Sequence, residues 1–205
     1  MENQERKEKL QPLLREVLKL LGEDPNRDGL LNTPQRWADA LLTYTEGNHI
    51  DPQEHLNVIF RLDEGDYPQD SDDMILVDNI EFTSTCEHHL APFRGVVHIA
   101  YIPNNLSRAI TGLSKLSRVV ETFARRLQVQ ERLTQKIANA LDEHLKPLGV
   151  IVVVQALHYC MVSRGVQQRS SLSLTTARRG LFQERSDLEG KFQEYLKLRM
   201  DTSKG

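Results

Sequence analysis

The densest group of potential metal ligands in the sequence is the tetrapeptide CEHH, which begins at Cys86. Cys86 and His89 are separated by two residues, a spacing that lets one turn bring a thiolate and an imidazole to the same ion. The second of the chain's two cysteines, Cys160, stands in the sequence HYC, in a segment that we expect to be a β-strand. Because alternate strand residues share a face, His158 and Cys160 are predicted to point the same way. The sequence therefore predicts a zinc site with Cys86, His89 and Cys160 as ligands.

Three protein ligands would leave the fourth position of a tetrahedral zinc ion to water, which is the arrangement of a catalytic site. The pKa of such a water falls to about 7, so that a nucleophile is available at neutral pH. His88 and His158 lie beside the ligands in the sequence and would carry protons, because histidine titrates in this range. Composition alone leaves two alternatives open: a closed Cys2His2 structural site, and two buried thiols that bind nothing.

A second group of residues has the chemistry of a nucleotide site. Lys115 and Arg118 share one face of an expected helix, and Ser114 is the expected N-cap of that helix. A helix start that offers N–H groups, a hydroxyl and cations is suited to phosphate. Gln130 and Glu131 open the next expected helix, and a carboxylate beside an amide can read a guanine edge. The same residues are also compatible with a solvated helix face and with an ordinary helix start.

The hydrophobic pattern predicts the elements that must position these residues. Apolar residues at helical spacing indicate helices over residues 2–21, 34–45, 114–127, 129–145 and 187–198. Strands are expected over residues 74–84, 95–103, 149–162 and 170–177. Strands, two helices and then further strands indicate an α+β fold. We expect an N-terminal helical region with its connector over residues 1–70, including a short helix near Glu54, and a catalytic domain over residues 71–205.

The composition limits the classes of function. The chain has 205 residues, of which 39% are hydrophobic and 27% charged, as in an ordinary globular protein. A formal net charge of -3 does not favour nucleic acid as a partner. No apolar run approaches the roughly 20 residues that span a bilayer, and the charged N-terminus lacks the apolar stretch of a secretory signal. We therefore expect a cytoplasmic protein with reduced thiols that binds neither nucleic acid nor membrane.

Four stretches of the sequence closely resemble the GTP cyclohydrolase I family. They are DPNRDGLLNTPQR (24–36), STCEHHLAPFRGVVHIAYIPN (84–104), GLSKLSRVVETFARRLQVQERLTQKIANAL (112–141) and ALHYCMVSRGV (156–166). The resemblance runs in order from about Asp24 to Phe182. Several long motifs in the same order are far more specific than any single short motif.

The resemblance implies a role for each residue that matches a family motif. Cys86, His89 and Cys160 match the family's zinc ligands, and His88 and His158 match its catalytic histidines.

The resemblance also implies how the substrate is held. Glu131 matches the carboxylate that anchors guanine, and Gln130 is expected to help it. The residues that match the family's triphosphate and ribose contacts are Ser114, Lys115, Arg118 and Arg164. Arg36 matches a phosphate-binding arginine that a neighbouring subunit contributes.

The resemblance further implies the fold, the assembly and the reaction. The family has the tunnelling fold, an antiparallel sheet with a helix pair on one face, and its subunits close their sheets into barrels within a toroidal homodecamer. Sites then lie at subunit interfaces, and barrel closure removes exposed sheet edges. The implied reaction is hydrolysis of GTP at C8 of guanine, followed by rearrangement to 7,8-dihydroneopterin triphosphate and release of formate. This is the first step of pterin and folate biosynthesis.

Two departures from the family pattern and two competing interpretations remain. Ser173 stands where threonine is typical, Ala177 stands where a hydroxyl residue is typical, and the link over residues 104–112 is longer than usual. One competing interpretation is a non-catalytic, zinc-stabilised homo-oligomer of the same fold. Another is a different enzyme of this fold, such as a pterin synthase or a nitrile reductase. The latter would need a thiol nucleophile, whereas both cysteines stand in zinc-ligand motifs.

Overall fold

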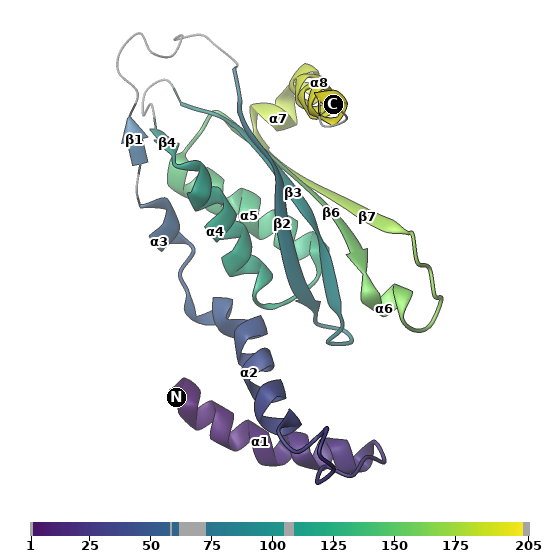
Figure 1. Cartoon of the computed structure of the whole chain (residues 1–205). Coiled ribbons are helices and arrows are strands. Elements are labelled where there is room, and N and C mark those ends of the chain that lie inside the picture. Colours follow the sequence, from purple (N-terminus) through teal and green to yellow (C-terminus); the bar gives the residue numbers. More distant parts are fainter. Residues whose placement is uncertain (1, 58, 62–72, 105–108, 203–205) are drawn as a thin grey trace. The chain divides into compact units, whose positions relative to one another are not determined.

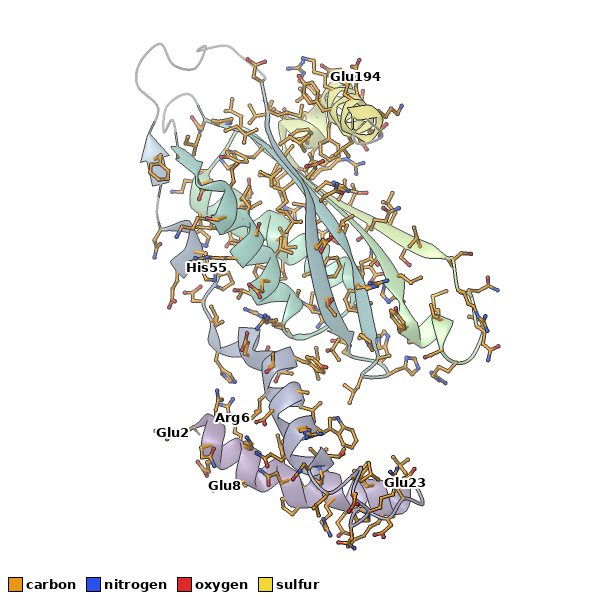
Figure 2. All side chains as sticks on the ribbon, viewed as in Figure 1. Glu2, Arg6, Glu8, Glu23, His55 and Glu194 are labelled. Atoms are coloured by element: carbon orange, nitrogen blue, oxygen red, sulfur yellow. The ribbon has the colours of Figure 1, made fainter. Side chains whose placement is uncertain are left out.

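The computed structural model describes residues 2–57, 59–61, 73–104 and 109–202. The chain divides into two compact units, Met1–Glu46 and Gly47–Gly205. The sequence places the corresponding boundary near residue 70, but the second unit begins earlier because a short helix, α3 (Gln53–Leu56), belongs to it. Leu56 is buried in the main core, and Nε2 of His55 lies 2.9 Å from Oγ1 of Thr122. Figure 2 labels His55 on this short helix.

The N-terminal unit is a helix pair. Helix α1 (Asn3–Leu20) ends before Gly22, whose φ of 84° is easily adopted by glycine, and α2 (Thr33–Thr45) follows. Helix α2 begins one residue before the expected start at residue 34, carries a proline in its first turn and has Asn32 as its N-cap. Lys7 and Asp39 form an ion pair of 2.7 Å between the two helices.

The second unit is built on a five-stranded sheet with the order β5-β2-β3-β6-β7 (Figure 1). Its strands are β2 (Ile75–Cys86), β3 (Pro92–Ile102), β5 (Leu127–Gln128), β6 (Gly149–His158) and β7 (Leu172–Gly180). All neighbours are antiparallel except β5, which pairs in parallel with the end of β2. A separate two-stranded ladder joins β1 (Ile59–Arg61) to β4 (Ala109–Thr111).

One face of the large sheet is covered by the helix pair that the sequence predicts. Helices α4 (Leu113–Ala124) and α5 (Gln130–Leu145) bury their apolar faces against β2, β3 and β6 in the main core (Figure 1). Alternate residues of the same strands pack on the other face against α7 (Leu181–Glu184) and α8 (Ser186–Thr202). The architecture is therefore a mixed α and β fold with a largely antiparallel sheet, as expected.

Several element boundaries differ from the predicted ones. Gly112, not Ser114, is the N-cap of α4, so Ser114 lies inside the first turn. Strand β6 ends at His158, and the next residues form a short helix, α6 (Tyr159–Val162). The predicted connector before β2 contains a 3-10 helix, Glu46–His49, together with α3 and β1, and residues 62–72 lie outside the described part of the chain. Residues 105–108 of the long link also lie outside it.

The described helices were also compared with the length and hydropathy that crossing a bilayer requires. None of them meets both requirements.

Candidate metal centre and active site

A tight turn between β2 and β3 carries the first two candidate ligands. Its ends are joined by main-chain hydrogen bonds: N–H of Cys86 donates to O of Ala91, and N–H of Leu90 donates to O of Cys86, each at 2.8 Å. Leu90 has a φ of 53°, in the left-handed region that reverses the chain direction. N–H of Glu87 donates to O of Gln128 at 3.0 Å, which ties the turn to β5. The turn is therefore closed by the backbone itself.

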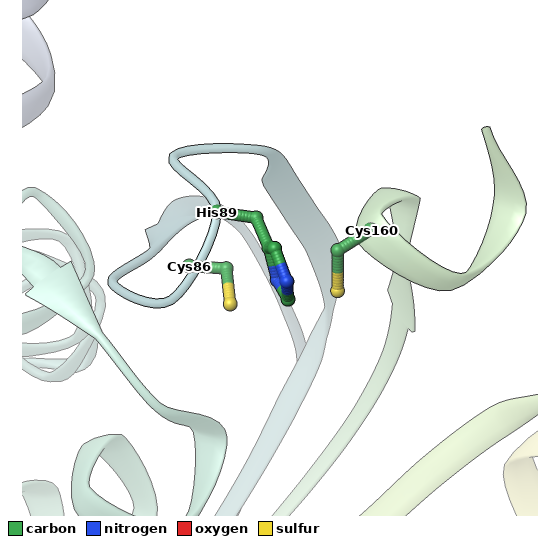
Figure 3. Close-up of side chains that lie close together, drawn as sticks. All are labelled: Cys86, His89 and Cys160. Carbon is green, nitrogen blue, oxygen red and sulfur yellow. The ribbon is translucent and has the colours of Figure 1, made fainter. Parts of the chain in front are cut away.

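Cys160 meets this turn from the other side, as Figure 3 shows. The ligand atoms of Cys86, His89 and Cys160 all lie within 4.8 Å of one another. The residues are those that the sequence predicts, but the predicted reason is wrong for Cys160. This residue lies in the first turn of α6, so that it does not share a strand face with His158. The chain turns away from β6 immediately after His158 and thereby directs the Cys160 sulfur to the turn.

The donor set suits a zinc ion. Two thiolates and an imidazole are ligands that zinc prefers. Because thiolate sulfur is a soft ligand, this donor set disfavours the hard ions magnesium and calcium. Burial raises the pKa of the Cys160 thiol, and the nearby Cys86 sulfur raises it further. A cation between the two sulfurs would reverse this effect by favouring thiolates. Within the part of the chain that the structure describes, the group has three members and includes neither His88 nor His158, which favours an open site over a closed Cys2His2 site.

The ring of His158 is fixed by two neighbours. It stacks on the ring of Phe93, its partner across the β3–β6 ladder, with 4.7 Å between centroids and an interplanar angle of 3°. Nε2 of His158 lies 2.8 Å from Oε1 of Gln130. Burial lowers the pKa of His158, and the carboxylate of Glu131 partly opposes this shift. The lowered pKa favours the neutral form of the His158 ring at neutral pH.

Gln130 has a different position from the one that the sequence suggests. Its side chain is 1% exposed, and its amide group donates to O of Val154 at 3.0 Å and to O of Ser173 at 3.1 Å. Its carbonyl oxygen faces His158. In this arrangement the polar atoms of Gln130 are engaged inside the protein, and the expectation that its side chain helps to read guanine stays a prediction.

The next two residues of α5 point outward. Glu131 is exposed and remains available to a ligand, and its charge acts on His158. Arg132 forms a two-pronged ion pair with Glu87, in which both nitrogen–oxygen distances are 2.7 Å. Arg132 lowers the pKa of Glu87, so the pair is ionised at neutral pH. The link was not predicted from the sequence, although Glu87 stands inside the ligand motif and Arg132 follows the predicted guanine anchor.

The remaining catalytic candidate, His88, lies on the same turn. Its side chain is exposed, and its ring centroid is 6.3 Å from that of His89 in an edge-to-face arrangement. His88 is therefore close to the three ligands and accessible to a substrate.

The predicted phosphate residues of α4 lie at the opposite end of the sheet. The main-chain N–H of Thr111, just before α4, donates to the hydroxyl oxygen of Tyr101 at 3.3 Å, and Tyr101 pairs with Ile75 at the start of β2. The last residue of α4, Ala124, accepts a hydrogen bond of 2.6 Å from Oγ of Ser84, near the Cys86 end of β2. Helix α4 has 12 residues and spans about 18 Å, so its first turn is far from the ligand turn. Within one copy of the chain, Ser114 and Lys115 therefore lie far from the candidate metal centre.

The three arginines that are predicted to bind phosphate or ribose are exposed and lie on different segments of the chain. Arg118 is exposed one turn further along α4, and Arg164 is exposed just after α6, on the segment that carries Cys160. Arg36 is exposed on α2, in the N-terminal unit.

Comparison with known proteins identifies relatives over nearly the whole chain. Residues 10–197 match the family model described as GTP cyclohydrolase I. GTP cyclohydrolase 1 of Saccharomyces cerevisiae is 49% identical over 183 residues, covering 88% of this chain and 71% of that one. The enzyme of the same name from Porphyromonas gingivalis is 49% identical over 189 residues, which cover 92% of this chain and 93% of that one.

A third relative and one solved structure complete the comparison. GTP cyclohydrolase 1 of Bacillus mycoides is 43% identical over 190 residues, covering 93% of this chain and 96% of that one. Among solved structures, the archaeosine synthase QueF-Like in its apo form is similar with a TM-score of 0.44 and 16% identity, over 54% of this chain and 96% of that one. The family model and the close relatives agree, and the chain belongs to the GTP cyclohydrolase I family.

Proposed function

We propose that this protein hydrolyses GTP at C8 of guanine and rearranges the product to 7,8-dihydroneopterin triphosphate with release of formate. The observation that carries the proposal is the convergence of Cys86, His89 and Cys160 beside two histidines, in a chain whose relatives bear the name GTP cyclohydrolase 1. Opening the imidazole ring of guanine and releasing formate are hydrolytic steps. They require an activated water and groups that move protons, and the site offers both kinds of residue.

Cys86, His89 and Cys160 would hold a zinc ion. When bound, zinc supplies the Lewis acid that makes water nucleophilic near neutral pH. His88 is exposed beside the ligands, and His158 is held at the end of β6, so these two residues supply the proton transfers to and from the purine ring. Glu131 accepts hydrogen bonds from the N1–H and 2-amino groups of guanine, which fixes the base relative to the histidines.

The phosphate contacts require a second copy of the chain. Ser114 and Lys115 lie at the end of the sheet opposite the ligand turn, so they cannot reach a nucleotide bound at their own metal centre. We propose a homo-oligomer, a decamer by the resemblance, in which α4 of one subunit faces the metal centre of another. Arg118, Arg164 and Arg36 would complete the binding of triphosphate and ribose. Pairing of β7 with another subunit would also cover the open edge of the sheet.

The proposal is tested by incubating the purified, zinc-loaded protein with GTP. We expect release of formate and, after oxidation, a fluorescent pterin, at about one zinc per chain. The matched variant is His158→Ala, which removes a proton carrier and leaves all three ligands. It should retain zinc while turnover falls by about 100- to 10,000-fold.

Two outcomes would contradict this function. Full zinc content with no formate from GTP would favour the non-catalytic, zinc-stabilised oligomer. Loss of zinc in His158→Ala would make His158 a ligand and would return the closed Cys2His2 site to consideration.

A further inference from the structure

The buried amide of Gln130 completes a hydrogen-bond network that ends on His158. The NH2 group of Gln130 faces the main-chain oxygens of Val154 and Ser173, which lie on the neighbouring strands β6 and β7. Carbonyl oxygens can only accept hydrogen bonds, so the amide can have only one orientation. Its own oxygen, Oε1, must then face Nε2 of His158, at 2.8 Å.

A ring of hydroxyl contacts reinforces this orientation. Oγ1 of Thr134 donates to the main-chain oxygen of Gln130 at 2.8 Å, and it lies 2.6 Å from Oγ1 of Thr175. Because the Thr134 proton is used in the first bond, the Thr175 hydroxyl donates to Thr134. The oxygen of Thr175 then accepts from the NH2 group of Gln130 at 3.1 Å. The donor and the acceptor of each hydrogen bond among these three residues are therefore fixed. They agree with only one orientation of the Gln130 amide group.

These hydrogen-bond directions allow only one tautomer of the neutral His158 ring. Oε1 of Gln130 is an acceptor, so Nε2 of His158 must carry the proton that bridges the 2.8 Å distance. In a neutral imidazole the other nitrogen, Nδ1, then has the free lone pair. The Phe93 ring, which is fully buried, lies parallel to the imidazole and prevents it from turning about its axis.

We propose that Gln130 is a positioning residue, which holds the His158 ring in the tautomer protonated at Nε2 and so leaves Nδ1 as the ring nitrogen with a free lone pair. The effect on turnover rests on the proposed function, whereas the tautomer does not.

The arrangement distinguishes Gln130 from its neighbour Glu131. Both stand in the first turn of α5, but Gln130 is 1% exposed and faces the sheet, while Glu131 faces solvent. A residue that binds substrate should mainly change KM, whereas a residue that positions a proton carrier should mainly change kcat.

The first arm of the test measures the tautomer directly. Solid-state NMR of zinc-loaded protein with 13C,15N-labelled histidine, recorded well above the ordinary pKa of histidine, separates protonated from unprotonated ring nitrogens and assigns each to Nδ1 or Nε2. Subtracting the spectrum of His158→Ala identifies the His158 signals among the chain's 7 histidines. We expect a protonated Nε2 and an unprotonated Nδ1. A His158 ring protonated at Nδ1 would overturn the proposal, whether or not the protein acts on GTP.

The second arm uses Gln130→Met, which keeps the length and volume of the side chain and removes its polar atoms. We expect full zinc content, a mixture of His158 tautomers, and a kcat that is lower by about 10- to 100-fold with KM nearly unchanged. The matched control is Gln135→Met, an exposed position on the same helix whose amide contacts Arg179. It should leave the tautomer and kcat unaltered.

The outcomes separate the competing roles of Gln130. A raised KM with unchanged kcat would show that Gln130 binds guanine instead, and an unchanged tautomer and kcat would show that it has no positioning role. If Gln130→Met does not fold, the tautomer of the wild-type protein decides, because that arm needs no change at Gln130. A His158 ring protonated at Nε2 supports the proposal, and a ring protonated at Nδ1 overturns it.

Discussion

The two helices of the pair differ in what their first turns do. The first turn of α5 lies at the ligand end of the sheet, where Gln130 bonds to His158 and Arg132 bonds to Glu87. The first turn of α4 lies at the other end, where Ser114 is exposed, and Arg118 is exposed one turn later. Antiparallel neighbours necessarily place their N-termini at opposite ends of a sheet. The candidate metal centre is therefore built within one chain, whereas the phosphate contacts of the proposed function would come from a second copy of the chain.

The largest effect should come from removing a ligand at the α5 end. Cys160→Ser replaces a thiolate by a weakly acidic hydroxyl, so zinc affinity should fall by more than about 1,000-fold and turnover of GTP should disappear. Zinc content after dialysis against a chelator measures the loss. The matched control is Met161→Leu on the same short helix, which should keep its zinc. Retention of zinc by Cys160→Ser would mean that the metal is held by other residues.

Complementation between two inactive variants tests whether the ligand end and the α4 end of one site come from different copies of the chain. Cys160→Ser disables the ligand end, and Lys115→Ala disables the α4 end. If each site joins the ligand end of one copy to the α4 end of another, coexpressed mixtures should recover about a quarter of the wild-type activity, since that fraction of sites receives two intact halves. Recovery of no activity, with mixed oligomers demonstrated by differential tags, would place both ends of the site in one chain.

A smaller effect is expected from a change at Glu131, an exposed residue in the first turn of α5. Glu131→Gln removes a charge that accepts hydrogen bonds from guanine, so KM should rise by about 10- to 100-fold with zinc content unchanged. Steady-state kinetics and metal analysis measure both quantities. Glu143→Gln, an exposed carboxylate near the other end of the same helix, is the control. An unchanged KM in Glu131→Gln would remove Glu131 from the base-binding role.

The smallest of these effects should come from the ion pair that ties the ligand turn to α5. Glu87→Gln removes the charge that Arg132 binds, so zinc affinity should fall by about tenfold, as for other groups that orient a metal ligand. Arg132→Gln should produce a similar loss, and the double variant should be little worse than either single one. Competition with a chelator of known affinity provides the measurement. Additive losses would show that the two residues act separately.

The sequence predicts the composition of the candidate site better than its geometry. The spacing of Cys86 and His89 is short, so a local turn is enough to bring them together, and the structure places them within 4.8 Å of Cys160. The apolar run VIVVVQALHYCMV carries no signal for the end of β6, because only packing against β3 and the turn decides where the strand stops. For the same reason Cys160 was assigned to the wrong element.

The role of a side chain that faces inward is harder to predict. Gln130 and Glu131 are adjacent in the sequence, and nothing local distinguishes the buried residue from the exposed one. The difference depends on the position of α5 over β6 and β7, which is a property of the whole sheet. The helix pair and most strands were predictable, in contrast, because their apolar residues follow the helical and strand periods.

The main-chain hydrogen bonds that close the turn from Cys86 to Ala91 have a consequence for the maturation of the protein. In small zinc-finger domains the ion organises an otherwise unfolded peptide, and removing it denatures the domain. Here the hairpin, the parallel strand β5 and the core beneath them hold the first two donors in place by themselves. Metal binding would then act on donors that the folded chain already holds, and cobalt could be exchanged for zinc in the folded protein to give the centre a visible colour.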